Sequence, residues 1–179
     1  RSDYLFLEGY LVASPKGVEV CRSAIEIAKE HETKVSISFS DPNIINAFRK
    51  DIKSLLEIQC DLIFCNEEEA LAYAETDSVN NAFELLKETS PNFLITQGSS
   101  GCVGFDGKNQ IDIPGHKVEA IDSNGAGDMF AGAVLYCLSQ GQSLEDGAKF
   151  GCYAASKVVS HVGPRLSKEE YKKIKVNYF

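Results

Sequence analysis

Apolar and polar positions follow two kinds of pattern along this chain. Short apolar runs predict strands at residues 4–9, 61–65 and 92–96, and alternating apolar residues predict a strand at residues 34–40. Longer segments with apolar residues at helical spacing predict helices, at residues 15–32, 43–56, 79–88, 127–139, 144–160 and 169–174. Strands that alternate with helices in this way indicate an α/β fold, with a mainly parallel sheet and helices on both faces. One domain over residues 1–179 is the simplest account.

Turn and capping residues add detail to this outline. Asp106 and Gly107 lie between two short apolar runs and predict an antiparallel hairpin of residues 102–105 and 111–113. Residues 118–121 predict a further strand that leads into a glycine-rich turn. Asn66 is a predicted N-cap followed by three glutamates, and Ser167 is a predicted N-cap of the last helix.

Composition and charge exclude several classes of partner. The formal net charge is -8 with 44% hydrophobic residues, which argues against a nucleic acid or an anionic membrane as partner. No apolar run approaches the ~20 residues that span a bilayer, and six scattered cysteines show no zinc spacing. We expect a cytoplasmic protein with reduced, mostly buried thiols. The chain begins at Arg1 without Met, and we expect a fragment or a processed chain.

A turn of small residues carries the clearest candidate chemistry. Gly125, Ala126, Gly127 and Asp128 lie between the strand predicted at 118–121 and the helix predicted at 127–139. Small residues let a ligand approach the backbone, and the first N–H groups of a helix can hold a transferring phosphoryl group. An Asp in that first turn can accept the proton of an attacking hydroxyl. The alternative is an ordinary glycine-rich turn in which Asp128 balances the helix dipole.

The segment 122–132 closely resembles the second signature of the PfkB (ribokinase-like) family of carbohydrate and nucleoside kinases, which usually reads D-T-x-G-A-G-D before a helix of small residues. The resemblance implies transfer of the ATP γ-phosphoryl group to a primary hydroxyl of a sugar or nucleoside. Asp128 would then be the catalytic base. The N–H groups of Gly125, Ala126 and Gly127 would stabilise the phosphoryl oxygens.

Three further segments resemble motifs of the family in the expected order. Asn66 and Glu69 match its N-x-x-E motif, which implies that they organise water-bound Mg²⁺ and the ATP phosphates. Thr96, Gly98 and Gly101 match its T-x-G-x-x-G loop near the nucleotide. Read alone, the first pair would be an N-cap with an acidic first turn, and the loop would be an ordinary entry to a hairpin.

The third segment is the helix predicted at 144–160 together with the loop after it. The resemblance places Cys152 and Ala155 against the adenine, and alternatively such residues only pack on the sheet. In the family, this loop and positions equivalent to Asp122 and Asn124 often hold a monovalent cation. Asp122, Asn124 and Gly163 are therefore candidates for binding K⁺.

Local sequence favours one branch of the family. Residues 8–11 and 151–156 are closest to the adenosine-kinase branch. The Asp41-Pro42-Asn43 stretch is similar to fructokinase-like members, but position 45 is Ile instead of their Arg. Adenosine is thus the favoured acceptor, followed by ribose- or fructose-type sugars. His31, His116 and His161 fall in no catalytic spacing and are expected at the surface or in turns.

The resemblance covers nearly all of this chain but only the C-terminal part of a typical member. The N-terminal strands and the lid, which usually supply most acceptor-binding residues and through which a homodimer would form, lie outside it. An alternative from another class is therefore a nucleotide-binding fragment or a regulatory homologue without kinase activity.

Overall fold

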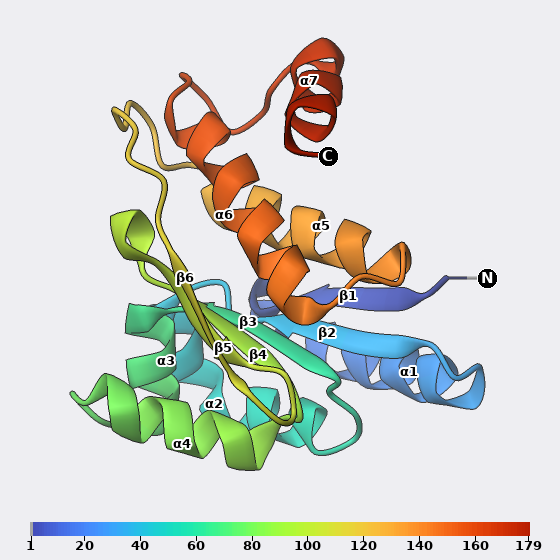
Figure 1. The fold of residues 1–179 in the computed structure, drawn as a ribbon. Coiled ribbons are helices and arrows are strands. Elements are labelled where there is room, and N and C mark those ends of the chain that lie inside the picture. The colour runs from blue at the N-terminus through green and yellow to red at the C-terminus, as the bar shows by residue number, and fades with distance from the viewer. Residues whose placement is uncertain (1) are drawn as a thin grey trace. The chain divides into compact units, whose positions relative to one another are not determined.

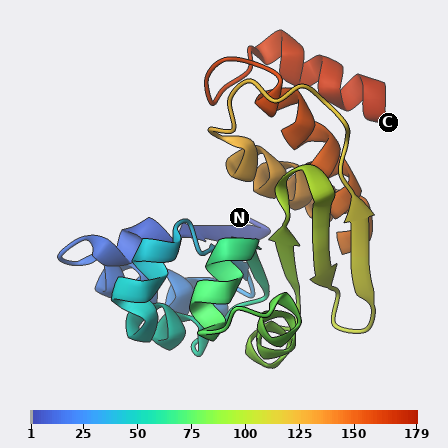
Figure 2. The same ribbon diagram turned by 90° about the vertical axis from the view of Figure 1, so that its left-hand side faces the viewer.

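The computed structural model describes residues 2–179. Arg1, at which we expect a processed or fragment start, lies outside the described residues. The chain forms two compact units (Figures 1 and 2). The first comprises Arg1–Thr96 and Gly104–Gln110, and the second comprises Gln97–Val103 and Ile111–Phe179. Each unit has its own packing, and each is described separately below.

The first unit contains the parallel part of the sheet. Its strands are β1 (Tyr4–Glu8), β2 (Lys34–Ser38), β3 (Leu62–Asn66) and β4 (Phe93–Thr96). Its helices are α1 (Gly17–Glu30), α2 (Pro42–Leu56), α3 (Glu67–Ala74) and α4 (Val79–Thr89), with a 3-10 turn at Gly9–Ala13. The pairs β1–β2, β2–β3 and β3–β4 are all parallel, so the carboxyl ends of the four strands meet at one edge. Polar residues that follow these strands therefore lie near one another.

The sheet has six strands in the order β1-β2-β3-β4-β5-β6. The last two are β5 (Gly101–Phe105) and β6 (Gln110–Pro114), and both cross from one unit to the other. Asp106 fixes the turn between them, because its Oδ1 accepts the N–H of Lys108 at 2.9 Å and also that of Asn109. The predicted hairpin and the α/β fold with a mainly parallel sheet are confirmed.

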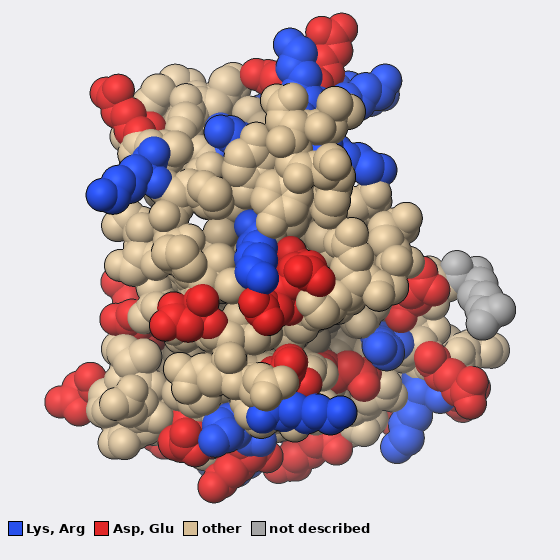
Figure 3. All heavy atoms as spheres, viewed as in Figure 1, with Lys and Arg blue, Asp and Glu red and all other residues tan. Residues whose placement is uncertain are grey.

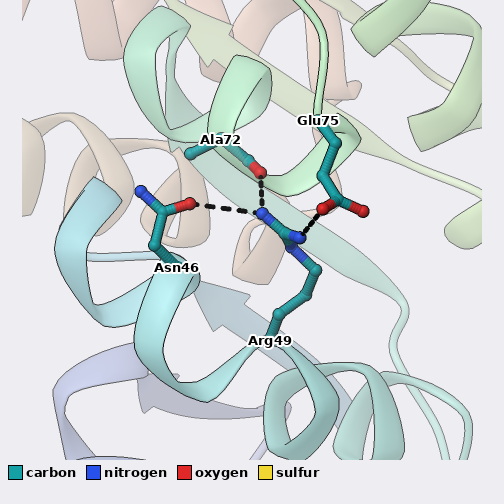
Figure 4. Close-up of polar contacts among 4 residues, drawn as sticks. All are labelled: Asn46, Arg49, Ala72 and Glu75. Carbon is teal, nitrogen blue, oxygen red and sulfur yellow. Dashed lines mark hydrogen bonds and ion pairs between the residues drawn. The ribbon is translucent and has the colours of Figure 1, made fainter.

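Arg49 of α2 ties this helix to the end of α3 (Figure 4). Its Nη2 donates to the Ala72 carbonyl at 2.7 Å and to Asn46 Oδ1 at 3.2 Å. Nη1 forms an ion pair with Glu75, whose left-handed backbone ends α3. The last carbonyls of a helix lack intrahelical donors, so Arg49 satisfies one of them and fixes the orientation of α3.

The second unit is helical. It contains a 3-10 turn at Gly98–Ser100 and the helices α5 (Ala126–Ser139), α6 (Leu144–Val159) and α7 (Lys168–Tyr178). A Cβ atom at Gly151 of α6 would lie 2.7 Å from the ring of Phe130 in α5, so this glycine allows the two helices to approach closely. Ile174 of α7 belongs to the same apolar cluster as Phe150 and Val158 of α6.

The strand predicted at residues 118–121 is wrong, because this segment has no regular secondary structure. Val118 and Ile121 are 40% and 59% exposed. The backbone N–H groups of Ile121 and Asp122 donate to the carbonyl of Val159 at the end of α6 instead of to a strand. These two bonds place the glycine-rich turn directly beside the loop that follows α6.

Within residues 2–179, the helices are all too short or too polar to cross a membrane. Acidic and basic side chains are interspersed on the face drawn in Figure 3.

Candidate functional site

Asn66 and Glu69 form a reciprocal cap where β3 passes into α3. The Asn66 side-chain oxygen accepts the backbone N–H of Glu69 at 2.8 Å. In return, the Glu69 carboxylate accepts the backbone N–H of Asn66 at 2.9 Å and its side-chain amide at 2.8 Å. The predicted N-cap is therefore confirmed, and the two side chains are held rigidly at the carboxyl edge of the sheet.

The environment of Glu69 is unusual for a carboxylate. The residue is only 6% exposed. Burial raises its pKa, the bond from the Asn66 backbone opposes this shift, and the nearby Asp41 and Glu68 charges raise the pKa further. A buried carboxylate among like charges gains from a cation, since a nearby positive charge offsets both effects.

The chemistry of this pair fits water-bound Mg²⁺. A carboxylate offers about four lone-pair sites, and each Glu69 oxygen uses one for Asn66. The remaining sites can accept hydrogen bonds from metal-bound water, which Mg²⁺ retains readily. In the described part of the chain, no group of three or more His, Cys, Asp or Glu residues could hold a metal ion.

Thr96 lies next to this cap. Asn66 and Thr96 are register partners in the β3–β4 pair, and the Thr96 hydroxyl donates to the Cys65 carbonyl at 3.4 Å. The structure thus brings together one residue predicted to organise Mg²⁺ and one predicted to bind the nucleotide. Ligands of open α/β sheets bind at this edge of the strands.

Two side chains at this edge were not among the predicted site residues. The Tyr10 hydroxyl, just after β1, donates to Asp41 Oδ2 at 3.5 Å, just after β2. Desolvation raises the pKa of Tyr10, and the Asp41 charge raises it further. Each follows the end of a predicted strand, and this position points to a shared site only once the order of the strands in the sheet is known. They add a phenol and a carboxylate to the polar edge that holds Glu69.

In the second unit, Gly125 begins the turn that carries Asp128. Its backbone is left-handed, with φ of 76° and ψ of 0°, and it is the N-cap of α5. A Cβ atom here would lie 2.4 Å from the carbonyl oxygen of Pro164. Only glycine combines this conformation with such close contact, so the turn is fixed against the loop after α6.

The next residues leave the start of α5 open. A Cβ atom at Gly127 would meet no atom within 4 Å, and both Gly127 and Asp128 are exposed. The Ala126 N–H donates to the Ser123 carbonyl at 3.3 Å. The amides of Gly127 and Asp128 belong to a first turn, which lacks intrahelical acceptors. An anionic oxygen can therefore approach the backbone beside an exposed carboxylate.

Asp122 links the three residues predicted to bind K⁺. Its Oδ1 accepts the Asn124 N–H and its Oδ2 accepts the Gly163 N–H, both at 3.0 Å. These bonds, first that from Asn124 and then that from Gly163, lower the pKa of Asp122. The carboxylate thus draws the turn and the loop after α6 together. Carboxylate and carbonyl oxygens are suitable ligands for a hard cation.

The predicted nucleotide loop is the 3-10 turn at Gly98–Ser100. Gly98 has φ of 56° and open space around it, whereas a Cβ at Gly101 would lie 2.0 Å from the Ile113 carbonyl oxygen. Gly101 is therefore required by packing, and Gly98 leaves backbone open to a ligand. Cys152 is buried in α6 and Ala155 is partly buried one turn later. Among predicted site residues, Thr96, Asn66 and Glu69 belong to the first unit and the others to the second.

Comparison with known proteins gives a consistent result. Residues 1–170 match the family described as pfkB family carbohydrate kinase. Adenosine kinase 1 of Arabidopsis thaliana is 31% identical, over 91% of this chain and 51% of the relative. Fructokinase-1 of Oryza sativa subsp. japonica is 34% identical, over 73% of this chain and 44% of the relative.

A solved structure agrees with these relatives. The adenosine kinase of Sinorhizobium meliloti superposes with a TM-score of 0.93 at 29% identity, over 99% of this chain and 55% of that structure. The chain thus spans about half the length of the proteins it matches. The match over residues 1–170 and the similarity to Arabidopsis thaliana adenosine kinase 1 show that this chain belongs to the pfkB family of carbohydrate kinases.

Proposed function

We propose that this chain supplies the phosphoryl-transfer half of a kinase that moves the ATP γ-phosphoryl group to a primary hydroxyl of a nucleoside or sugar. The turn at Gly125–Asp128 carries this proposal. It presents an exposed carboxylate in the first turn of a helix whose N-terminal backbone is open to an anion. In-line phosphoryl transfer requires mainly positioning and charge stabilisation, and this turn supplies both.

Each residue of the turn has a distinct part in the reaction. Asp128 accepts the proton of the attacking hydroxyl. The N–H groups of Gly125, Ala126 and Gly127 stabilise the oxygens of the transferring group, and Gly127 is the only exposed residue of these three. The Ala126 N–H already donates to Ser123 at 3.3 Å, so it takes part through a bifurcated or exchanged hydrogen bond. Gly125 fixes the turn and gives it its shape.

The remaining predicted residues bind the nucleotide and the cations. Mg²⁺ held through water near Asn66 and Glu69 would neutralise part of the phosphate charge. Asp122, Asn124 and Gly163 are candidates for binding K⁺ at the base of the turn. The nucleotide would be bound by Thr96, Gly98 and Gly101 of the loop after β4 and by Cys152 and Ala155 of α6.

We favour adenosine as acceptor, followed by ribose- or fructose-type sugars. Relatives named adenosine kinase and fructokinase both match this chain, and residues 8–11 and 151–156 are closest to the adenosine-kinase branch. Tyr10, which is 52% exposed at the carboxyl edge, offers an aromatic face that can stack on a nucleobase.

The test is acceptor-dependent ATP consumption, measured with adenosine, ribose and fructose. It uses the longest natural form of the protein alongside the 179-residue chain. We expect the longest form to release ADP fastest with adenosine. The chain spans about half of its relatives, which favours a second function, nucleotide binding without transfer. If ATP binds yet no acceptor yields ADP in either form, that second function is correct.

A further inference from the structure

A cavity of about 300 Å³ lies between α6 and α7, entirely within the second unit (Figure 1). Leu166 and Ile174 line it, and both are buried members of the apolar cluster to which the two helices contribute. The ring of Tyr153 lines it as well and packs against the same cluster. The cavity therefore has an apolar floor, and its volume is within the range of small-molecule sites.

Two lysines, one from each helix, stand beside this floor. Lys157 of α6 lines the cavity, and its Nζ lies 4.7 Å from the centroid of the Tyr153 ring. Lys173 of α7 lines the cavity too. The ion pairs among residues 2–179 involve neither lysine. Each ammonium group carries three donors, so both lysines can donate hydrogen bonds to a ligand.

Glu170 is the acidic residue that lines the cavity, and its carboxylate is already engaged. Its Oε2 accepts the backbone N–H of Ser167 at 2.7 Å, as part of the capping box of α7. The bonds with Ser167 are the main causes of its lowered pKa, and the nearby charges of His161 and Lys173 lower the pKa further. Two lysines against one glutamate give the lining a net positive charge, in a chain whose formal net charge is -8. This local field favours an anionic ligand.

His161 gives a second, independent indication of a ligand. It lines the cavity, and its Nδ1 is buried without a hydrogen-bond partner among residues 2–179. Buried polar atoms without a partner are rare in folded proteins, and each one calls for an explanation. An oxygen of an anionic ligand in the cavity would accept a hydrogen bond from this imidazole after a rotation of the ring.

We propose that the cavity between α6 and α7 binds a small phosphate monoester with an apolar organic part. A phosphate monoester carries a charge of about −1.5 to −2 at pH 7, which matches two ammonium groups better than the single charge of a carboxylate. Its phosphate oxygens accept charge-assisted hydrogen bonds from Lys157 and Lys173. Its organic part lies on the floor formed by Leu166 and Ile174. The ligand thus bridges the two helices.

The test is isothermal titration calorimetry of phenyl phosphate into the longest natural form of the protein. We expect one molecule bound per chain, with NMR amide shifts concentrated at residues such as Leu166 and Ile174. Phenol and inorganic phosphate should each bind more weakly, because each lacks one half of the probe. If phenyl phosphate does not bind, or if its amide shifts lie outside this cavity, the proposal is overturned.

Charge variants separate a built site from general attraction. Lys157→Gln and Lys173→Gln should each weaken binding of phenyl phosphate about tenfold. Lys172→Gln is the matched control, because it removes the same charge from an exposed residue of α7 that does not line the cavity. Its affinity should stay within about twofold of the wild type. Equal weakening in all three variants would show non-specific attraction and overturn the proposal, and circular dichroism checks that each variant is folded.

A final arm distinguishes this cavity from the proposed nucleotide site. Cys152 and Ala155, the residues of α6 proposed to bind the nucleotide, do not line the cavity. Phenyl phosphate should therefore bind with similar affinity when ATP with Mg²⁺ is saturating. Its displacement by ATP would overturn the separate site. If phenyl phosphate binds as expected and ATP itself does not bind, the cavity is supported and the proposed function fails.

Discussion

Replacing Gly125 by alanine tests whether the turn before α5 is fixed by its backbone. The native φ of 76° is left-handed, a conformation that costs an L-residue about 1–2 kcal/mol. The new Cβ would also lie 2.4 Å from the backbone oxygen of Pro164, and overpacking of this kind costs about 1–3 kcal/mol. The expected loss in the free energy of unfolding is thus about 2–5 kcal/mol.

Gly127→Ala is the matched control, two residues further along the same turn. Its Cβ would meet no atom within 4 Å, and alanine in place of glycine in a helix gains up to about 1 kcal/mol. Stability should therefore be unchanged or slightly higher. The methyl group would however occupy the space through which phosphate approaches the backbone, so turnover should fall even though the fold is retained.

The assay is thermal unfolding of both variants in the longest natural form of the protein, with turnover measured in parallel. A loss of 2 kcal/mol lowers the melting temperature by at least about 4 °C in a domain of this size, so Gly125→Ala should be clearly resolved. A Gly125→Ala protein that melts with the wild type would refute the argument from backbone geometry. A Gly127→Ala protein with wild-type turnover would refute the argument that phosphate approaches there.

Three further substitutions, one of them with a matched control, test the helix packing, the charge of Asp122 and the anchoring of α3. Gly151→Ala should lower the free energy of unfolding by about 1–3 kcal/mol, because the new Cβ would clash with the ring of Phe130. Gly132→Ala is the control and should cause no such loss, because a Cβ there meets no atom within 4 Å. Urea unfolding measures both. The pKa of Asp122 in the folded protein is lowered from its ordinary value of 3.8. The charged carboxylate therefore stabilises the fold above pH 3.8, and this stabilisation is lost as the pH falls through the pKa of the folded protein. Asp122→Asn should therefore flatten the fall in melting temperature below about pH 4, and an unchanged profile would contradict this. Arg49→Gln should lower the free energy of unfolding by about 1–2 kcal/mol, because it removes the hydrogen bond to the Ala72 carbonyl. Urea unfolding measures this loss. Wild-type stability would show that α3 does not depend on this bond.

Much of the fold follows from local rules that tertiary contacts did not override. The apolar runs at β1 to β4 and the spacing in α4, α5 and α6 placed these elements within one or two residues of their observed bounds. The N-caps at Asn66 and Ser167 could be predicted because they depend on local sequence. In both helices the capping residue and a Glu three residues later form a capping box.

The failure at residues 118–121 has a physical cause. Val118 and Ile121 are β-branched residues of the kind that favour strands, but the N–H of Ile121 donates to the carbonyl of Val159 at the end of α6. This partner lies far along the chain, so local sequence contains no signal for it. The same limit explains why the local sequence did not reveal the hydrogen bond from Gly163 to Asp122.

Part of the candidate site could be predicted from the sequence, because some of its contacts join residues that are close along the chain. Asn66 with Glu69, and Gly125 with Asp128, are short-range motifs whose geometry is set within a few residues. Tyr10 and Asp41 become neighbours only because β1 and β2 are parallel and end at one edge. Recognising them needs the strand order, which the local pattern does not supply.

The most direct test of the central claim is the turnover number of Asp128→Asn in the longest natural form of the protein, compared with Glu169→Gln. Both are exposed carboxylates in the first turn of a helix, so both substitutions remove a favourable interaction with a helix dipole, but only Asp128 is proposed to accept a proton. With ATP affinity measured separately, we predict nearly unchanged ATP binding in both variants, a kcat that falls by orders of magnitude in Asp128→Asn, and a normal kcat in Glu169→Gln. A kcat for Asp128→Asn close to that of the wild type would contradict the account.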